Sequence, residues 1–320
     1  MTLRAELEPE RVDKVLAAEF RGVSRASVQR WIEEGRVLVD GRVLRRSDRV
    51  EGGMTLDVDP GPPPPSDVAP DPRVPFEVLH EDDDVMVVVK PAGVVVHPGR
   101  GHWEGTLVSG LIARPGFERA TFDPRDPLGP LRPGIVHRLD KDTSGVLVVA
   151  KSARAREGLK DALARHDVER VYLGVTLGVP RAGRLESLHG RSPSSRRKFS
   201  SRVLEGRKAV TTVQVVEPLA GGRAALVRCT LETGRTHQIR VHLSEIAGAP
   251  IFADPLYGRT PADPELAPLS TGLGRHALHA AVLGFTHPVT GAALRFEAPL
   301  PPELAQLVAA LRALGPGYRR

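Results

Sequence analysis

The sequence predicts a protein of mixed α/β (α+β) class with two domains. Short runs of branched apolar residues, such as 146–150, are typical of buried strands, whereas 155–164 repeats its apolar residues at helical spacing. With 320 residues, 41% of them hydrophobic and 26% charged, the chain has the size and composition of a globular protein of about two domains. We expect a small domain at 1–59 and a larger one at 76–320, separated by a proline-rich linker at 60–75.

The composition excludes several classes of protein. No apolar run approaches the ~20 residues that a membrane-spanning helix needs, and the N-terminus lacks the apolar core of a signal peptide. The single cysteine, Cys229, excludes an intramolecular disulfide and a cysteine-rich zinc site, and its alternating neighbours predict a core position on a strand. We therefore expect a cytoplasmic protein that has neither a membrane nor a metal as partner.

The net charge of +6 favours a polyanionic partner, because most of the basic residues are arginine, which suits phosphate groups. A GC-rich genome that encodes basic residues as arginine would also explain the number of arginines without a polyanionic partner. The placement of the cations along the chain is therefore more informative than their number.

The small domain is predicted to hold two helices and a β-hairpin. Apolar residues recur at helical spacing within 12–16 and 28–32, and the Asp-Gly pair at 40–41 predicts a type I′ turn. The arginines here alternate with acidic residues, so by themselves they predict a solvated face of mixed charge. The order of features from Ser24 to Gly41, however, resembles the S4 RNA-binding domain. That resemblance implies phosphate contacts from Arg25, Arg30, Arg36 and Arg42.

The candidate chemistry gathers in the polar segment 137–144. This segment holds two carboxylates, Asp140 and Asp142, beside a histidine, two cations and two hydroxyls. The apolar runs 135–136 and 146–150 on either side are expected to be strands that hold this charged loop in place.

The residues alone leave several interpretations of this loop open. Asp142 fits ordinary turn chemistry, and Asp140 fits half of a structural ion pair with a neighbouring arginine. His137 with both aspartates would suit a metal, although no further ligand cluster stands at a typical spacing. On the residue pattern alone, a catalytic role and a structural role for this loop are about equally supported.

Nine contiguous residues, His137 to Gly145, resemble the active-site motif of the RluA-type family of RNA pseudouridine synthases. The aspartate of that motif is the family's catalytic residue, and its position here is Asp140. The segments 79–98, 231–243 and 278–291 extend the resemblance in the expected order over nearly the whole chain.

The resemblance also implies roles for residues outside the central motif. Tyr172, by default an ordinary core aromatic, stands where the family has its active-site tyrosine. Arg235 stands where the family's arginine pairs with the catalytic aspartate, although 239–243 fits either a helix or a strand. Arg138 is expected to fill the space that a flipped target nucleotide vacates. Val89 departs from the pattern, because the family's motif has asparagine there.

The densest basic segment, 191–208, would by itself predict a solvated loop. Next to a nucleic-acid site it favours phosphate binding. The residues of this segment that are expected to bind RNA are Arg196, Arg197 and Lys198.

The resemblance implies a catalytic domain built on a long mixed, largely antiparallel sheet, preceded by an S4 domain. It implies isomerisation of uridine to pseudouridine in RNA, without a metal or an organic cofactor. Asp140 would be the nucleophile, Tyr172 would stack on the base and take a proton, and Arg235 would keep Asp140 ionised. Large-subunit ribosomal RNA is favoured as substrate over transfer RNA, and a monomer is expected.

Three alternatives remain. Within the family, the substrate would instead be transfer RNA. A non-catalytic S4-type RNA-binding or ribosome-assembly protein would need only basic surfaces, so the intact Asp140, Tyr172 and Arg235 argue against it. A metal-dependent phosphohydrolase or nuclease would use His137, Asp140 and Asp142, and loss of activity in EDTA would identify it.

Overall fold

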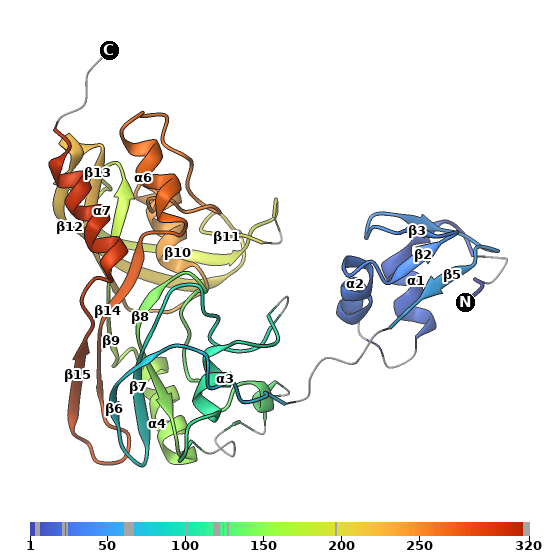
Figure 1. The fold of residues 1–320 in the computed structure, drawn as a ribbon, viewed down its shortest axis with the longest axis horizontal. Coiled ribbons are helices and arrows are strands. Elements are labelled where there is room, and N and C mark those ends of the chain that lie inside the picture. Colours follow the sequence, from blue (N-terminus) through green and yellow to red (C-terminus); the bar gives the residue numbers. More distant parts are fainter. Residues whose placement is uncertain are drawn as a thin grey trace. The chain divides into compact units, whose positions relative to one another are not determined.

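The computed structural model divides into two compact units, Met1–Pro65 and Ser66–Arg320, each with its own hydrophobic core (Figure 1). Within the part of the chain that the structure describes, no helix is long and apolar enough to cross a membrane. The described residues are 1–3, 7–20, 23, 25–60, 67–99, 102–117, 122–123, 125–126, 128–195 and 197–315.

The N-terminal unit packs helices α1 (Val12–Glu19) and α2 (Arg25–Glu33) against small strands. Both helices bury the apolar faces that their spacing predicts. The strands β2 and β3 form the predicted hairpin, and Asp40 and Gly41 have φ angles of 50° and 74°, as a type I′ turn requires. The strands of this unit are β1 (Glu10–Arg11), β2 (Val37–Val39), β3 (Arg42–Val43), β4 (Arg49–Val50) and β5 (Leu56–Val58).

The larger unit is built on a ten-stranded sheet in the order β11-β10-β12-β13-β9-β14-β8-β7-β6, with β15 paired to β14. The β8–β14 pair is parallel and the other pairs among the described strands are antiparallel, which confirms the predicted mixed, largely antiparallel sheet. The strands are β6 (Glu77–Glu81), β7 (Val85–Lys90), β8 (Ser144–Ala150), β9 (Glu169–Leu177), β10 (Gly183–Arg191), β11 (Phe199–Ser200), β12 (Arg207–Leu219), β13 (Ala224–Leu231), β14 (Leu278–Thr286) and β15 (Ala293–Glu297).

Helices cover the sheet in Figure 1, where α4 lies against β8 and α7 lies along β12. Ser152 caps α4, because its hydroxyl accepts the backbone N–H of Ala155. The helices are α3 (Leu107–Ile112), α4 (Ala153–Arg165), α5 (Gln238–Val241), α6 (Leu266–Leu273) and α7 (Pro302–Ala313). Shorter segments are the 3₁₀ turns η2 (Gly129–Leu131) and η3 (Ala220–Gly222) and the π-helical turn η4 (His242–Ile246).

Strand β8, which lies between β14 and β7, is buried along its whole length. Its side chains alternate between two apolar clusters, with Leu147 and Val149 in one and Val146 and Val148 in the other. A strand buried on both faces explains why this run is continuously apolar in the sequence. Asp140 lies in the loop that leads into this strand, so a strand that is buried on both faces positions it.

Two segments differ from the predictions. Residues 67–75 were predicted to belong to an extended linker, but Val68 is buried in the larger core and Val74 packs against Gly110 of α3. Residues 135–136 were predicted to be a strand, but the structure has one isolated bridge there, between Ile135 and Val149. In both segments contacts with distant residues decided the structure, and local composition did not reveal them.

Gly145 of β8 lies so close to β14 that a side chain does not fit. Its φ is 122°, and an added Cβ would overlap with the carbonyl oxygen of Ala280.

We predict that Gly145→Ala lowers the free energy of unfolding by about 3 kcal/mol or more, through backbone strain and overpacking. Urea unfolding measures this loss. Gly272→Ala, at an exposed position of α6 where nothing lies within 4 Å of an added Cβ, is the matched control and should change stability by less than about 1 kcal/mol. Equal effects of the two substitutions would contradict the packing argument.

Candidate active site

The loop that carries Asp140 is tied to the segment after β7 by one buried cation. Lys90, the last residue of β7, is fully buried. Its Nζ donates at 2.7–2.9 Å to three carbonyl oxygens, those of Pro91, Val94 and Lys141. Burial lowers the pKa of Lys90 to about 7, whereas three carbonyl acceptors match the three donors of its ammonium form. Lys90 thereby fixes the backbone next to Asp140.

The next two residues of the loop are held by the segment that precedes β14. Arg275 Nη1 donates to the carbonyl oxygen of Asp142 at 3.0 Å. The hydroxyl of Thr143 lies 2.8 Å from Nε2 of His276. Asp142 lies in a turn, as predicted, and its main chain supports the loop.

The carboxylate of Asp140 forms an ion pair with Arg240, a residue of α5. Arg240 Nη1 donates to Asp140 Oδ2 at 3.0 Å, and its Nε and Nη2 donate to the two oxygens of Asp254 at 2.7 and 2.9 Å. Asp254 Oδ1 also accepts the backbone N–H groups of Leu256 and Tyr257. One guanidinium therefore joins two carboxylates, and Asp254 fixes the plane in which Arg240 faces Asp140.

The charges of this group keep Asp140 ionised. Burial opposes ionisation of Asp140, but the nearby His237 and Arg240 together outweigh it and hold the pKa of the carboxyl below its usual value. Burial likewise opposes ionisation of Asp254, whose pKa is lowered by its hydrogen bonds with Arg240. The two carboxylates in turn raise the pKa of Arg240 against the effect of burial.

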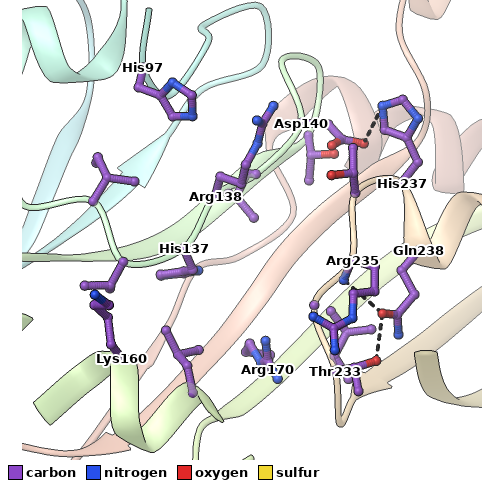
Figure 2. A pocket seen from close by; sticks show the side chains of 18 of the residues that line it. His97, His137, Arg138, Asp140, Lys160, Arg170, Thr233, Arg235, His237 and Gln238 are labelled. Atoms are coloured by element: carbon purple, nitrogen blue, oxygen red, sulfur yellow. Dashed lines mark hydrogen bonds and ion pairs between the residues drawn. The ribbon is translucent and has the colours of Figure 1, made fainter. Parts of the chain in front are cut away.

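His237 also lies beside Asp140, with its Nε2 3.9 Å from Asp140 Oδ2, the oxygen that Arg240 binds (Figure 2). It stands before α5 in the left-handed region, at φ 61°, which is uncommon outside glycine. The hydroxyl oxygen of Tyr257 accepts the backbone N–H of Phe199 at 2.8 Å. The same hydroxyl lies 2.8 Å from His237 Nδ1, to which it can donate its proton. Burial lowers the pKa of His237, so its neutral form presents Nε2–H to Asp140.

A pocket of about 800 Å³ opens beside Asp140 (Figure 2). Such a volume suits a small organic ligand or a single nucleotide. Tyr172 of β9 lines it and is 8% exposed, and burial raises the pKa of its hydroxyl to about 12. Arg138 lines the same pocket and is exposed. The structure thus brings Asp140, Tyr172 and Arg138 to one pocket.

The comparisons with known proteins identify the family of this chain. The sequence profile of the RNA pseudouridylate synthases matches residues 84–245, and that of the S4 domain matches 10–56. The chain belongs to the RNA pseudouridylate synthase family. It is therefore an RNA pseudouridine synthase, an isomerase with an S4 domain at its N-terminus.

Relatives of the synthase match over nearly the full chain. The ribosomal large subunit pseudouridine synthase D of Neisseria meningitidis serogroup B is 41% identical and covers 98% of this chain and 81% of its own. The protein of the same name from Xanthomonas campestris pv. campestris is 43% identical over 94% of this chain and 89% of its own. The structure of human RNA pseudouridylate synthase domain containing 4 is 27% identical with a TM-score of 0.55, over 75% of this chain and 95% of its own.

Arg235 does not pair with Asp140, contrary to the expectation from the resemblance. Its Nε donates to the carbonyl oxygen of Lys208 at 3.2 Å, and the charge partner of Asp140 is Arg240. The reason is the conformation after residue 237, which the sequence left open between helix and strand. Because α5 is helical, it turns Arg240 toward Asp140, while Arg235 stays in the turn before the helix.

The basic residues that were expected to bind RNA have different surroundings. In the larger unit, Arg197 is exposed, Lys198 Nζ lies 5.8 Å from the centre of the Tyr257 ring, and Arg196 lies outside the described residues. In the N-terminal unit each expected cation has an acidic neighbour. These pairs are Arg25–Asp13 at 2.8 Å, Arg30–Glu34 at 3.9 Å, Arg36–Asp59 at 2.6 Å and Arg42–Asp48 at 3.5 Å. The pairs of Arg30, Arg36 and Arg42 lie on the surface, and such pairs are weak enough to exchange for phosphate. The partner of Arg25, Asp13, is buried.

His137 is a structural residue of the pocket wall. Its Nε2 accepts the backbone N–H of Val148 at 3.1 Å, and burial lowers its pKa to about 3, so it is neutral. A nitrogen that accepts this bond is not available to a metal. Among the described residues, no three His, Cys, Asp or Glu side chains are grouped as metal ligands.

Asp254 and Tyr257 belong to the site although sequence reasoning did not select them. Asp254 precedes a proline, a pattern that is typical of a turn and carries no sign of a charge partner.

Val89, the departure from the family's motif, packs with the apolar cluster on one face of the sheet.

Removing the central cation should destabilise the fold in a way that depends on pH. Arg240→Gln leaves two buried carboxylates without their partner, so we predict a loss of about 3–5 kcal/mol in the free energy of unfolding at pH 8. In the wild type the pKa values of Asp140 and Asp254 are lower in the folded than in the unfolded protein. This difference stabilises the fold fully at a pH above the unfolded pKa values, and the stabilisation is lost as the pH falls through the folded pKa values. In the variant burial is no longer opposed by Arg240, so both pKa values are higher than in the wild type, and protonation relieves part of the loss as the pH falls.

Urea unfolding at pH 5 and pH 8 measures this difference. The loss caused by Arg240→Gln should be smaller at pH 5 than at pH 8. Arg235→Gln is the matched control, because Arg235 has no carboxylate partner among the described residues, and it should keep the pH dependence of the wild type. An equal loss at both pH values, or the same behaviour in both variants, would contradict the assignment of Arg240.

Proposed function

We propose that Asp140 is the nucleophile with which this synthase isomerises specific uridines of large-subunit (23S) ribosomal RNA. The observation that supports the role of Asp140 is its geometry: an ionised carboxylate that lines a nucleotide-sized pocket and is aimed by Arg240. The substrate is inferred from relatives named ribosomal large subunit pseudouridine synthase D, which match at about 40% identity over nearly the whole chain.

The reaction needs a fixed carboxylate. The bond between N1 of uracil and C1′ of ribose breaks, a bond between C5 and C1′ forms, and the proton lost from C5 is balanced by one gained at N1. Asp140 attacks as a nucleophile, which divides this exchange into two easier steps. Arg240 keeps the carboxylate charged and oriented without moving during the reaction, so its contribution is electrostatic preorganisation.

The pocket must receive a uridine that has left its stack. Arg138 is exposed beside Asp140 and occupies the space in the RNA that the flipped nucleotide vacates. The ring of Tyr172 stacks on the uracil inside the pocket. Its pKa of about 12 keeps the hydroxyl protonated at neutral pH, so we assign Tyr172 to stacking and hydrogen bonding rather than to ionised base catalysis, which revises the expectation from the sequence.

The remaining RNA-binding groups position the substrate. The S4 domain and the basic segment 191–208 bind phosphates, which orients the RNA without reading its sequence. We propose that the protein acts as a monomer in the cytoplasm, where it meets ribosomal RNA.

Other functions have less support. A non-catalytic RNA-binding protein would have no use for the Asp140–Arg240–Asp254 group, whose two buried carboxylates are costly to maintain. A metal-dependent phosphohydrolase would need His137, Asp140 and Asp142 grouped as ligands, but among the described residues no three His, Cys, Asp or Glu side chains are grouped in this way. Transfer RNA remains the alternative substrate that the same experiment tests.

Mapping pseudouridine in ribosomal and transfer RNA, with and without this protein, tests the substrate. Cells that lack it should lose pseudouridine at one or a few positions of 23S ribosomal RNA and keep those of transfer RNA. Wild-type protein supplied from a plasmid should restore the lost positions, whereas a protein with Asp140→Asn should not. Loss confined to transfer RNA would contradict the proposed substrate, and restoration by the Asp140 variant would contradict the proposed nucleophile.

A further inference from the structure

A second arginine of the pocket, Arg170, is buried without a counter-charge. It lies on β9 and is 6% exposed. Its Nη2 donates to the carbonyl oxygen of Glu232 at 2.8 Å, and its Nε has no protein partner among the described residues. No described carboxylate forms an ion pair with it. Burial lowers the pKa of Arg170 from its high usual value, but the group stays charged at neutral pH.

Arg170 is part of the pocket wall. It lies two residues before Tyr172 on the same strand, so both side chains point to the same face. An added Cβ at Gly234 would lie 2.7 Å from Arg170 Nη1, so the guanidinium packs against the backbone of the turn that carries Arg235. Figure 2 shows Arg170 and Arg235 among the side chains that line the pocket.

Most other cations of the pocket are already neutralised. Their ion pairs are Arg132–Asp126, Arg156–Glu157, Lys160–Asp123 and Arg240–Asp140. Neither Arg170 nor Arg235 has a carboxylate partner in the part of the chain that the structure describes. Burying an uncompensated charge costs several kcal/mol, so a folded protein keeps one where a ligand supplies the opposite charge. The wall around Arg170 and Arg235 therefore has the electrostatics of an anion site.

We propose that Arg170 and Arg235 form a phosphate subsite inside the pocket, which binds a backbone phosphate flanking the uridine that enters it. The anion is a phosphate because the substrate is RNA, and phosphates are the anionic groups of its backbone. Arg235, half-exposed, contacts the phosphate, and Arg170 supplies the buried charge beside it. This inference rests on the proposed function, since it concerns the RNA that Asp140 acts on. It assigns Arg235 to substrate binding in place of the pairing with Asp140.

The salt dependence of RNA binding tests the subsite. Single-turnover rates on a ribosomal RNA fragment give the half-saturating RNA concentration at several KCl concentrations. Arg170→Gln should raise that concentration about tenfold, as expected when one buried charge close to the phosphate is lost. When the logarithm of the half-saturating RNA concentration is plotted against log[KCl], the slope for this variant should be shallower by about 0.7–0.9. This is the contribution of one phosphate contact. Arg170→Lys keeps the charge and should restore the slope.

Two further variants make the outcome decisive. Arg312→Gln, an exposed arginine of α7 paired with Glu217, makes the same change in net charge and should keep the wild-type slope. Arg235→Gln should flatten the slope like Arg170→Gln, and it decides the test if burial makes the Arg170 variant unstable. Wild-type slopes in both Arg170→Gln and Arg235→Gln, or a loss confined to the maximal rate, would overturn the subsite. A wild-type protein that does not convert the ribosomal fragment would instead overturn the proposed substrate.

Discussion

The active site depends on one guanidinium that is shared by two carboxylates. Arg240 donates to Asp140 and, through two further hydrogen bonds, to Asp254. Three charges in a buried place are stable only while all three are present, because each one compensates for the burial of the others. Asp254 contributes no chemistry of its own. It fixes the orientation of Arg240, and Arg240 fixes the charge and direction of the residue that we propose as the nucleophile.

The sheet serves this ion pair by holding the loop that carries Asp140. Lys90 at the end of β7 and Arg275 before β14 bind the main chain just after Asp140, at the carbonyl oxygens of Lys141 and Asp142. The two segments are far apart in the sequence, and they meet because β7 and β14 flank β8. The close approach of Gly145 to Ala280 belongs to the same arrangement. Stability and preorganisation therefore have a common origin in the centre of the sheet.

The sequence predicted those features of the fold that depend on interactions between residues close together in the chain. The Asp-Gly turn at 40–41 and strand β8 follow from backbone preferences and apolar runs. The charge partner of Asp140 was predicted wrongly, because the choice between Arg235 and Arg240 depends on whether α5 forms, and that is decided by packing. Asp254 and the burial of Val68 depend on contacts with distant residues, which one sequence does not reveal. The domain boundaries and the roles of Tyr172 and Arg138 stay predictions.

The role of Asp140 is tested most directly by tritium release from RNA labelled at C5 of uridine. Forming the bond between C5 and C1′ expels that hydrogen, so each release counts one turnover. The wild type should release tritium, whereas Asp140→Asn should bind the RNA with similar affinity and release at least about a thousandfold more slowly, as expected when a nucleophile is removed. Release by Asp140→Asn at a rate near that of the wild type would contradict the account, because Arg240 would then hold a residue that takes no part in the reaction.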